Sequence, residues 1–202
     1  MPDFQYELKA KEKGFKVICG VDEAGRGPLA GPVCAAAVIL PDGLEIEGLN
    51  DSKKLTEAKR EKLFDVIIEK AVSYSVAFGT VEEIEEYNIL NATFLAMNRA
   101  IEGLDIEPDY ALIDGNRVPK NIKIECETVV KGDAKSASIA AASVIAKVTR
   151  DRLLLRYAEK YPEYSFEKHK GYGTAVHYEA VRKYGLCPVH RPSFFKKFFE
   201  EK

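Results

Sequence analysis

The order in which short apolar runs and amphipathic segments follow one another constrains the fold of this chain more than any other feature. Two runs rich in Val, Ile and Ala come first, at 16–21 and 33–40, with a loop rich in glycine and proline between them. Two such runs separated by turn residues are expected to pair as an antiparallel hairpin. Patterns typical of helices and of further strands then alternate, which predicts an α/β domain with helices flanking a central sheet. The early hairpin makes that sheet mixed, with both parallel and antiparallel strand pairs.

Periodicity and capping residues place the remaining elements. Apolar residues recur at spacings of three and four from Tyr87 to Ile101, and Gly103 follows them as a C-cap. The run 136–161 is helical and begins with alanine and serine, which would let a helix lie very close to a sheet. Further strands are expected at 74–78, in a run ending at Asp114, and at 122–130, and further helices at 56–71 and 174–184.

The chain is expected to form a single domain over residues 1–202. It has 202 residues, 46% of them hydrophobic, which is enough for a full core. Repeats, low-complexity tracts and a clear linker are all absent from the sequence. The helical segment from about 163 to 202 is expected to cap one side of the sheet.

Composition favours a cytoplasmic protein without a membrane segment. The four cysteines are scattered with no CxxC pair, which is typical of buried thiols in a reducing compartment rather than of a disulfide frame or a zinc site. The N-terminus is too polar for a signal peptide, and the longest apolar run, 28–41, is too short and broken to span a bilayer. No heptad stripe is evident, so we expect a monomer.

Charge is segregated along the chain although its net value is only −2. Residues 41–110 carry a local charge of −9, whereas 116–150 carry +4 and 166–197 carry +5 together with all three histidines. A basic C-terminal half suits a polyanion on one face. Lopsided but merely solvated helix faces would give the same pattern.

Four carboxylates fall at or just beyond the ends of expected strands. Asp22 and Glu23 close the first strand, Asp114 closes the fourth, and Asp133 follows the fifth. If these strands are neighbours, the carboxylates converge at one sheet edge, where mutual repulsion would require cations. Oxygen ligands without His or Cys suit Mg²⁺ or Mn²⁺. The pattern therefore predicts a site with two divalent ions for phosphoryl transfer.

Each carboxylate also has a purely structural interpretation. Asp114 with Gly115 is a common turn dipeptide, and Asp133 before a helix could be a cap. Adjacent strand residues point to opposite faces, so Asp22 and Glu23 share a site only if the strand ends or bulges there. Their joint position at strand ends is what favours the metal site.

The loop that follows, "GRGPLA", fits the dinucleotide fingerprint but not its context. That fingerprint must open a helix, whereas Pro28, Gly31 and Pro32 interrupt one and a strand follows. A phosphate-binding Walker loop fails because no GK[ST] is present. Gly25 and Gly27 instead leave backbone groups free to approach a ribose 2′-hydroxyl, which both donates and accepts. Arg26 between them can reach a phosphate.

Six motifs, in order, resemble those of the ribonuclease HII family over about 17–194. They are "GVDEAGRGPLAGPV", "NDSKKL", "ALIDGN", "VVKGD", "SIAAASVIAKVTRD" and "HKGYGT". The resemblance implies the ribonuclease H-like fold, two-metal catalysis and action on the RNA strand of RNA–DNA hybrids. It also implies incision of DNA duplexes 5′ to embedded ribonucleotides, leaving a 3′-hydroxyl and a 5′-phosphate.

The resemblance also assigns roles to individual residues. Asp22, Glu23, Asp114 and Asp133 match the family's metal-binding carboxylates, and Gly25, Arg26 and Gly27 match the loop that recognises the ribonucleotide 2′-hydroxyl. Tyr172 matches the tyrosine that stacks on the next deoxyribose at the RNA–DNA junction. Lys53 looks like a phosphate contact, as does Lys147, although Lys53 could equally be an ordinary surface lysine and Tyr172 a half-buried loop aromatic.

Two points stay open from the sequence. Pro192 in "HRPSF" replaces a basic residue common in the family, which puts the C-terminal DNA contacts in doubt, and "SFFKKFF" is either packed or a partner-binding tail. An inactive nucleic-acid-binding module of the same fold is the alternative function, against which the four intact carboxylates argue. A nicotinamide-dependent oxidoreductase would need the helix that "GRGPLA" lacks.

Overall fold

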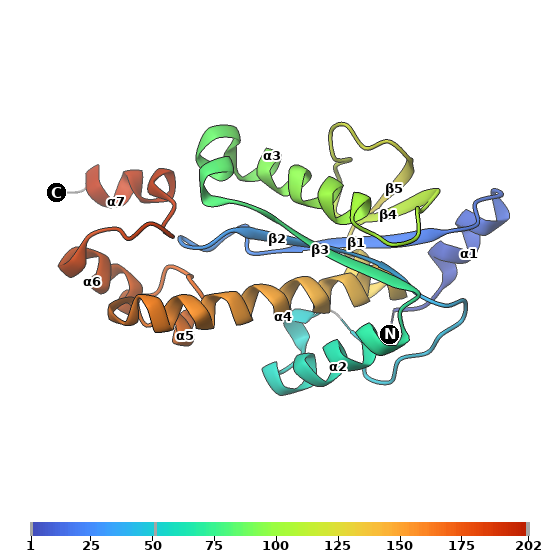
Figure 1. The fold of residues 1–202 in the computed structure, drawn as a ribbon, viewed down its shortest axis with the longest axis horizontal. Helices are drawn as coiled ribbons and strands as arrows, with labels where there is room; N and C mark the ends of the chain where they lie inside the picture. The colour runs from blue at the N-terminus through green and yellow to red at the C-terminus, as the bar shows by residue number, and fades with distance from the viewer. Residues whose placement is uncertain (1, 51, 201–202) are drawn as a thin grey trace.

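A five-stranded mixed sheet forms the centre of the protein (Figure 1). The computed structural model describes residues 2–50 and 52–200. The strand order is β3-β2-β1-β4-β5; β2 pairs antiparallel with both β1 and β3, whereas the β1–β4 and β4–β5 pairs are parallel. The predicted hairpin and mixed sheet are confirmed. The strands are β1 (Ile18–Ala24), β2 (Val33–Ile39), β3 (Ser73–Gly79), β4 (Tyr110–Asp114) and β5 (Glu125–Val129).

Helices cover both faces of this sheet. Helix α3 (Val81–Glu102) packs on β1, β2 and β3 from one side, and α4 (Ala137–Lys160) packs on β1 and β2 from the other (Figure 1). Helix α2 (Glu57–Lys70) lies against α4, and Thr56 caps it by accepting a hydrogen bond from the Lys59 N–H. The short helix α1 (Gln5–Glu12), which sequence patterning did not predict, contacts β4.

Alternate residues of β1 and β2 belong to the two different cores. Cys19 and Val21 join Val33, Ala35 and other residues under α3. Even-numbered residues of β2 pack instead with the alanines of α4. This period of two fixes the direction of every side chain along β1, including those of the acidic pair at its end.

Helix α4 approaches β1 very closely, as its small residues predict. A Cβ added to Gly20 would overlap the α4 backbone at Ser138 and Ile139. Ser136 caps this helix by accepting a hydrogen bond from the Ile139 N–H. The carboxylate of Glu7 in α1 accepts a further hydrogen bond from the Ser138 N–H at 3.0 Å.

The C-terminal segment caps one end of the molecule, beyond the end of α4 (Figure 1). It contains α5 (Phe166–His169), α6 (Ala175–Tyr184) and α7 (Lys196–Glu200), with short 3₁₀ turns at Pro162–Tyr164 and Pro192–Phe195. Its aromatic core includes Phe195, which is fully buried against Leu154 of α4 and Leu29 of the β1–β2 loop. Most of the "SFFKKFF" aromatics are therefore packed, while Phe199 is 44% exposed.

Several element boundaries differ from those predicted. Helix α3 begins at Val81, because Thr80 and Glu83 form a capping box, and it kinks at Asn88, whose φ is +69°. β5 begins only at Glu125, and β1 runs on to Ala24 instead of ending near Val21. Within residues 2–50 and 52–200, no helix combines the length and apolar character needed to cross a bilayer.

Candidate active site

The acidic pair on β1 lies where one neighbouring strand stops. β1 and β4 pair only as far as Val21 and Ile113, whereas β1 continues along β2 through Asp22 and Glu23 to Ala24. β1 therefore ends one residue after the pair, without a bulge at Asp22 or Glu23. The two side chains leave opposite faces of β1, but both lie beside Asp114, the last residue of β4. We call the sheet edge formed by these three residues the acidic notch.

The opposite faces give the two carboxylates different surroundings. Asp22 is 4% exposed on the α4 side, near Ser143 of that helix, and its Oδ1 accepts a hydrogen bond from the Glu23 N–H at 2.7 Å. Glu23 lies on the α3 side, in a hollow of about 340 Å³ that Arg26, Phe94 and Asp114 also line.

Asp114 and Asp133 are brought together by one backbone contact. The Gly132 N–H donates to Oδ1 of Asp114 at 2.7 Å, which holds the turn containing Asp133 against the end of β4. A Cβ on Gly132 would meet Ile139 at 2.6 Å and Asp114 Oδ1 at 3.2 Å, so glycine permits this close approach. Asp133 is buried, and the N-cap of α4 is Ser136, which excludes the simple capping interpretation of Asp133.

Burial and mutual repulsion make ionisation of this acidic group costly. Burial, then the charges of Glu23 and Asp114, raise the pKa of Asp22 well above its usual range, and a hydrogen bond from Ser143 only partly opposes them. Burial also raises the pKa of Glu23, against which Arg26 acts, with its Nη1 3.4 Å from Oε1 of Glu23. A bound cation would relieve both costs.

The donor set fits a hard divalent cation. All four side chains offer carboxylate oxygens, which Mg²⁺ and Mn²⁺ prefer. Across the part of the chain that the structure describes, no three His, Cys, Asp or Glu side chains are gathered closely enough to hold an ion by themselves. Mg²⁺ usually takes only one or two carboxylates and completes its shell with water and substrate phosphate, so this arrangement suits it.

Lys53 reaches the same acidic group from the turn before α2. Its Nζ lies 3.8 Å from Oδ2 of Asp133, and its side chain is 81% exposed. Ser52 beside it is buried, and its Oγ lies 2.8 Å from Oγ of Ser143. Ser143 thus contacts both the metal-site candidate Asp22 and the lysine-bearing turn. Asp51 of the same motif lies outside the described residues.

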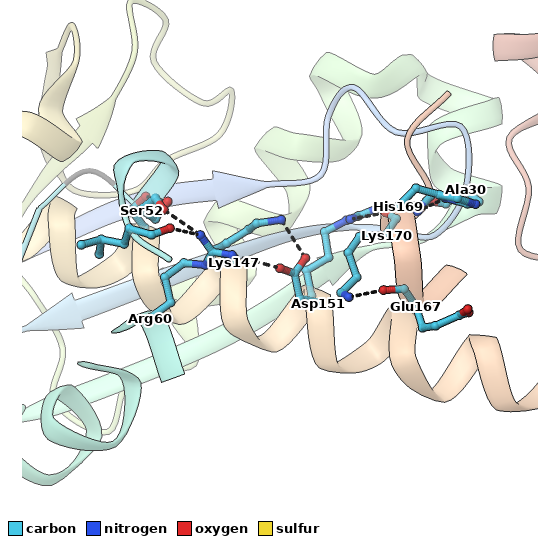
Figure 2. Close-up of polar contacts among 12 residues, drawn as sticks. Ala30, Ser52, Arg60, Lys147, Asp151, Glu167, His169 and Lys170 are labelled. Atoms are coloured by element: carbon cyan, nitrogen blue, oxygen red, sulfur yellow. Dashed lines mark hydrogen bonds and ion pairs between the residues drawn. The ribbon is translucent and has the colours of Figure 1, made fainter. Parts of the chain in front are cut away.

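A second polar network, centred on Asp151, holds Lys147 (Figure 2). Lys147 Nζ lies 2.7 Å from Oδ1 of Asp151, and Arg60 Nη2 lies 3.9 Å from Oδ2. Arg60 also donates to the backbone oxygens of Ser52 and Leu55, at 3.0 and 2.6 Å. Asp151 therefore connects the lysine-bearing turn to Lys147 through two cations.

Tyr172 lies between Lys147 and the loop of residues 25–32 that joins β1 to β2, which we call the glycine loop. The ammonium of Lys147 is 5.9 Å from the centroid of the Tyr172 ring, which is 45% exposed. A Cβ on Gly27 would lie 3.9 Å from Cε1 of the same ring. The structure thus brings the predicted loop, tyrosine and lysine to one surface.

The glycine loop is shaped by two buried arginines that the sequence analysis did not single out. Arg150 crosses beneath Gly25, whose φ is +95°, and donates to the carbonyls of Ala30, Pro32 and Lys170. Arg191 donates to four more carbonyls of the loop. Burial lowers the pKa of both arginines, that of Arg191 to about 9, which leaves it protonated at neutral pH.

No sequence signal distinguishes these two arginines from surface ones, because their partners are backbone carbonyls far away in the chain. Arg191 is fully buried and donates to the Gly25 carbonyl. It therefore stabilises the loop and is not an exposed contact for DNA. The loop after Gly27 leads directly into β2 with no helix, which removes the structural basis of dinucleotide binding.

The mixed sheet, its covering helices and the acidic notch define a ribonuclease H-like fold. The family model for ribonuclease HII matches residues 19–200, and the chain belongs to that family. It is an endoribonuclease that hydrolyses the RNA of RNA–DNA hybrids.

Curated relatives are similar over nearly the whole chain. The ribonuclease HII of Acetivibrio thermocellus is 59% identical over 193 residues, covering 96% of this chain and 75% of that protein. The ribonuclease HII of Marinomonas sp. is 59% identical over 186 residues, covering 91% and 94%.

Solved structures support the same assignment. Ribonuclease H2 of Pyrococcus horikoshii superposes with a TM-score of 0.75 at 30% identity, covering 93% of this chain and 100% of that one. The ribonuclease HII of Archaeoglobus fulgidus, solved in complex with PCNA, gives 0.68 at 26% identity, covering 87% and 94%. Bst ribonuclease HIII, in complex with Mn²⁺, gives 0.66 at 19% identity over 88% of this chain and 66% of that one, a likeness in fold.

Proposed function

We propose that this enzyme incises DNA duplexes on the 5′ side of an embedded ribonucleotide, in addition to cutting longer hybrids. The products would be a 3′-hydroxyl and a 5′-phosphate. The observation that carries the proposal is the neighbourhood of the acidic notch and the glycine loop, with Arg26 3.4 Å from Glu23 and Tyr172 next to Gly27. A group that can contact a 2′-hydroxyl thus lies beside one that can contact the adjoining deoxynucleotide.

The carboxylates would hold two divalent ions together with the scissile phosphate. Asp22, Glu23, Asp114 and Asp133 are the proposed ligands, with Mg²⁺ or Mn²⁺ as the ion. Bound there, such ions lower the pKa of an attacking water and stabilise the charge on the leaving 3′-oxygen. The Glu23 N–H donates to Oδ1 of Asp22 at 2.7 Å, and the Gly132 N–H donates to Oδ1 of Asp114, so both carboxylates are held by hydrogen bonds before substrate arrives.

Cationic side chains of the chain would hold the nucleic-acid backbone. The exposed ammonium of Lys53 stands beside Asp133, where a phosphate could replace part of its present contact. Lys147 is fixed by Asp151 with its charge near Tyr172. Backbone groups of Gly25 and Gly27, with Arg26, would contact the ribose and its phosphate. Such binding should weaken steeply with salt, because phosphate contacts release counterions.

The first experiment is cleavage of an end-labelled DNA duplex with one internal ribonucleotide. It is run with Mg²⁺, with Mn²⁺ and with chelator, beside an all-DNA duplex and the Asp114→Asn variant. We expect one metal-dependent cut 5′ to the ribonucleotide, absent in the variant, which still binds the duplex. Binding without cutting by the unmodified protein would refute the incision proposal, and full activity of Asp114→Asn would refute the assigned site.

Tyr172 provides a second test of the junction. Tyr172→Ala is expected to lower kcat/KM about tenfold on a single embedded ribonucleotide, which corresponds to a loss of about 1.4 kcal/mol when the contact with the deoxyribose is removed. A uniform hybrid offers no RNA–DNA step, so the loss there should be smaller. Equal losses on the two substrates would remove the junction role of Tyr172.

We also propose that the enzyme works as a monomer in the cytoplasm. All four cysteines, Cys19, Cys34, Cys126 and Cys187, are free thiols, as suits a reducing compartment. Size-exclusion chromatography with light scattering, with and without duplex, would test the monomer; a concentration-independent dimer mass would contradict it.

A further inference from the structure

The chain segment 187–191 lies against the glycine loop although more than 150 residues separate them in sequence. Its backbone runs beside the loop, where the Gly31 N–H donates to the Val189 carbonyl at 2.7 Å and the Arg191 N–H donates to the Leu29 carbonyl at 2.9 Å. Ala30 and His190 form an isolated antiparallel bridge between these contacts. The segment is therefore joined to the loop by backbone hydrogen bonds on both sides of this bridge.

The side chain of Arg191 collects carbonyls from the part of the loop that faces substrate in the proposed function. It donates to Gly25, Arg26, Pro28 and Gly31 oxygens at 2.7–3.0 Å. In a trans peptide the carbonyl and the following N–H point in opposite directions. Drawing the carbonyls of Gly25 and Arg26 inward therefore directs the N–H groups of Arg26 and Gly27 away from the guanidinium.

The neighbouring residue, His190, contacts His177, which in turn binds the loop of residues 170–174 that carries Tyr172. His177 Nδ1 lies 2.9 Å from the Tyr172 carbonyl, and His177 Nε2 lies 3.0 Å from His190 Nε2. At the far end, the Cys187 N–H donates to His190 Nδ1 at 2.9 Å. All of these ring nitrogens are buried with their histidines, which are at most 1% exposed.

These contacts permit only one arrangement of protons in neutral rings. The Tyr172 carbonyl can only accept, so His177 donates from Nδ1 and accepts at Nε2. His190 then donates from Nε2 and accepts the Cys187 N–H at Nδ1. Burial lowers the pKa of both histidines to about 4, so both are neutral at pH 7 and the chain of hydrogen bonds is intact.

Two adjacent residues thus hold the two loops that meet at the proposed RNA–DNA junction. The loops also contact each other directly, since the Leu29 N–H donates to the Gly171 carbonyl at 2.8 Å. Arg150 bridges them as well, through the carbonyls of Ala30 and Lys170.

We infer that His177, His190 and Arg191 are positioning residues. Arg191 shapes the loop that contacts the 2′-hydroxyl, and the histidine pair places Tyr172 and thereby sets the preference for a ribonucleotide followed by DNA. This inference rests on the proposed function. Every substrate with a 2′-hydroxyl requires the loop that Arg191 shapes. Only a substrate with an RNA–DNA junction also requires the placement of Tyr172 by the histidine pair.

Two substitutions of His177 distinguish the loss of its hydrogen bond to the Tyr172 carbonyl from the loss of its ring packing. In His177→Asn the side-chain amide nitrogen takes the place of Nδ1 and can still donate to Tyr172, whereas in His177→Gln it takes the place of Nε2 and cannot. Both remove the ring. We expect His177→Gln to lower the ratio of kcat/KM, single ribonucleotide over uniform hybrid, about tenfold, and His177→Asn to lower it at most about threefold.

A double-substitution cycle tests whether the effect passes through Tyr172. On the Tyr172→Ala background, His177→Gln should change that ratio by less than about twofold, because the group that it positions is gone. A general loss of stability would instead lower kcat/KM on both substrates alike, with or without the Tyr172 ring, and would leave their ratio unchanged. Melting temperatures of all variants are measured alongside, and assays are run at least 15 °C below the lowest, a margin set from the usual about 2–4 °C shift per kcal/mol.

Arg191→Lys keeps the charge but not the planar fork that serves four carbonyls. It should lower kcat/KM about tenfold or more on both substrates, with their ratio within about threefold of the unmodified protein. Equal ratios for the two His177 variants, an effect of His177→Gln that persists without the Tyr172 ring, or unchanged kcat/KM in Arg191→Lys would overturn the inference. Failure of the unmodified protein to incise at a single ribonucleotide would instead overturn the proposed function itself.

Discussion

Gly25 and Gly27 are two residues apart in one loop. An added methyl group should destabilise the fold at Gly25 but leave its stability nearly unchanged at Gly27. At Gly25 the backbone has a φ of +95°, and an added Cβ would lie 2.8 Å from Cζ of Arg150 and overlap its Nε and Cδ. At Gly27 the φ lies outside the left-handed region, and the nearest atom to an added Cβ is Tyr172 Cε1 at 3.9 Å. Gly25→Ala therefore perturbs the fold, whereas Gly27→Ala perturbs only the surface.

The cost of Gly25→Ala has two sources. A left-handed backbone at a residue with a Cβ costs about 1–2 kcal/mol. The methyl also displaces Arg150, which is 1% exposed and makes three hydrogen bonds to carbonyls. Losing even one bond from a charged donor costs about 1.5–3 kcal/mol. Together we expect a loss of roughly 3–5 kcal/mol in the free energy of unfolding.

Urea unfolding followed by circular dichroism measures this loss, with Gly27→Ala as the matched control. We expect the control to lie within about 0.5 kcal/mol of the unmodified protein, since it meets only ordinary contact. Its cleavage of ribonucleotide-containing duplex should nevertheless fall, because the methyl stands where the ribose would approach. A Gly25→Ala protein within about 1 kcal/mol of the unmodified one would refute the rigid placement of Arg150.

Three further outcomes are expected. Lys53→Gln should weaken duplex binding alike for all sequences and reduce the slope of log K against log salt by about one, measured by fluorescence anisotropy; an unchanged slope would contradict its phosphate contact. Asp22→Asn should abolish cleavage yet raise the free energy of unfolding at neutral pH without metal. The raised pKa of Asp22 means that its charge destabilises the fold above that pKa, so the two proteins should converge in acid, and a less stable variant at pH 7 would contradict this. Phe195→Ala should cost about 3–5 kcal/mol in urea unfolding, because its fully buried ring lies at the centre of the cap, and a loss below about 1 kcal/mol would show that the cap is not packed around it.

The early hairpin and the main helices could be predicted because each rests on local signals. Thr56 and Ser136 begin helices where their hydroxyls can cap them, and Gly103 and Gly185 end helices. Helix α1 was missed because its burial depends on the partner that Glu7 finds at the start of α4. That contact spans more than 120 residues, and no local pattern encodes it.

The sequence indicated the acidic residues of the candidate site. It did not indicate the buried arginines that hold the neighbouring loop. Asp114 ends a strand with a clear apolar run, so its position follows from periodicity. The way Asp22 and Glu23 share a notch depends instead on the β1–β4 pairing ending at Val21 and Ile113, which is a property of strand register. Arg150 and Arg191 resemble any other basic residues until the carbonyls around them are known.

The contact between Arg191 and Gly31 joins residues 160 positions apart, and this separation has a consequence for synthesis on the ribosome. The strands, the four carboxylates and α4 all emerge before residue 191 does. A nascent chain can therefore form its sheet and acidic notch while the loop beside them still lacks its guanidinium. Fragments that stop before Arg191 should leave the loop unshaped, so the growing polypeptide can order this loop only after residue 191 has emerged.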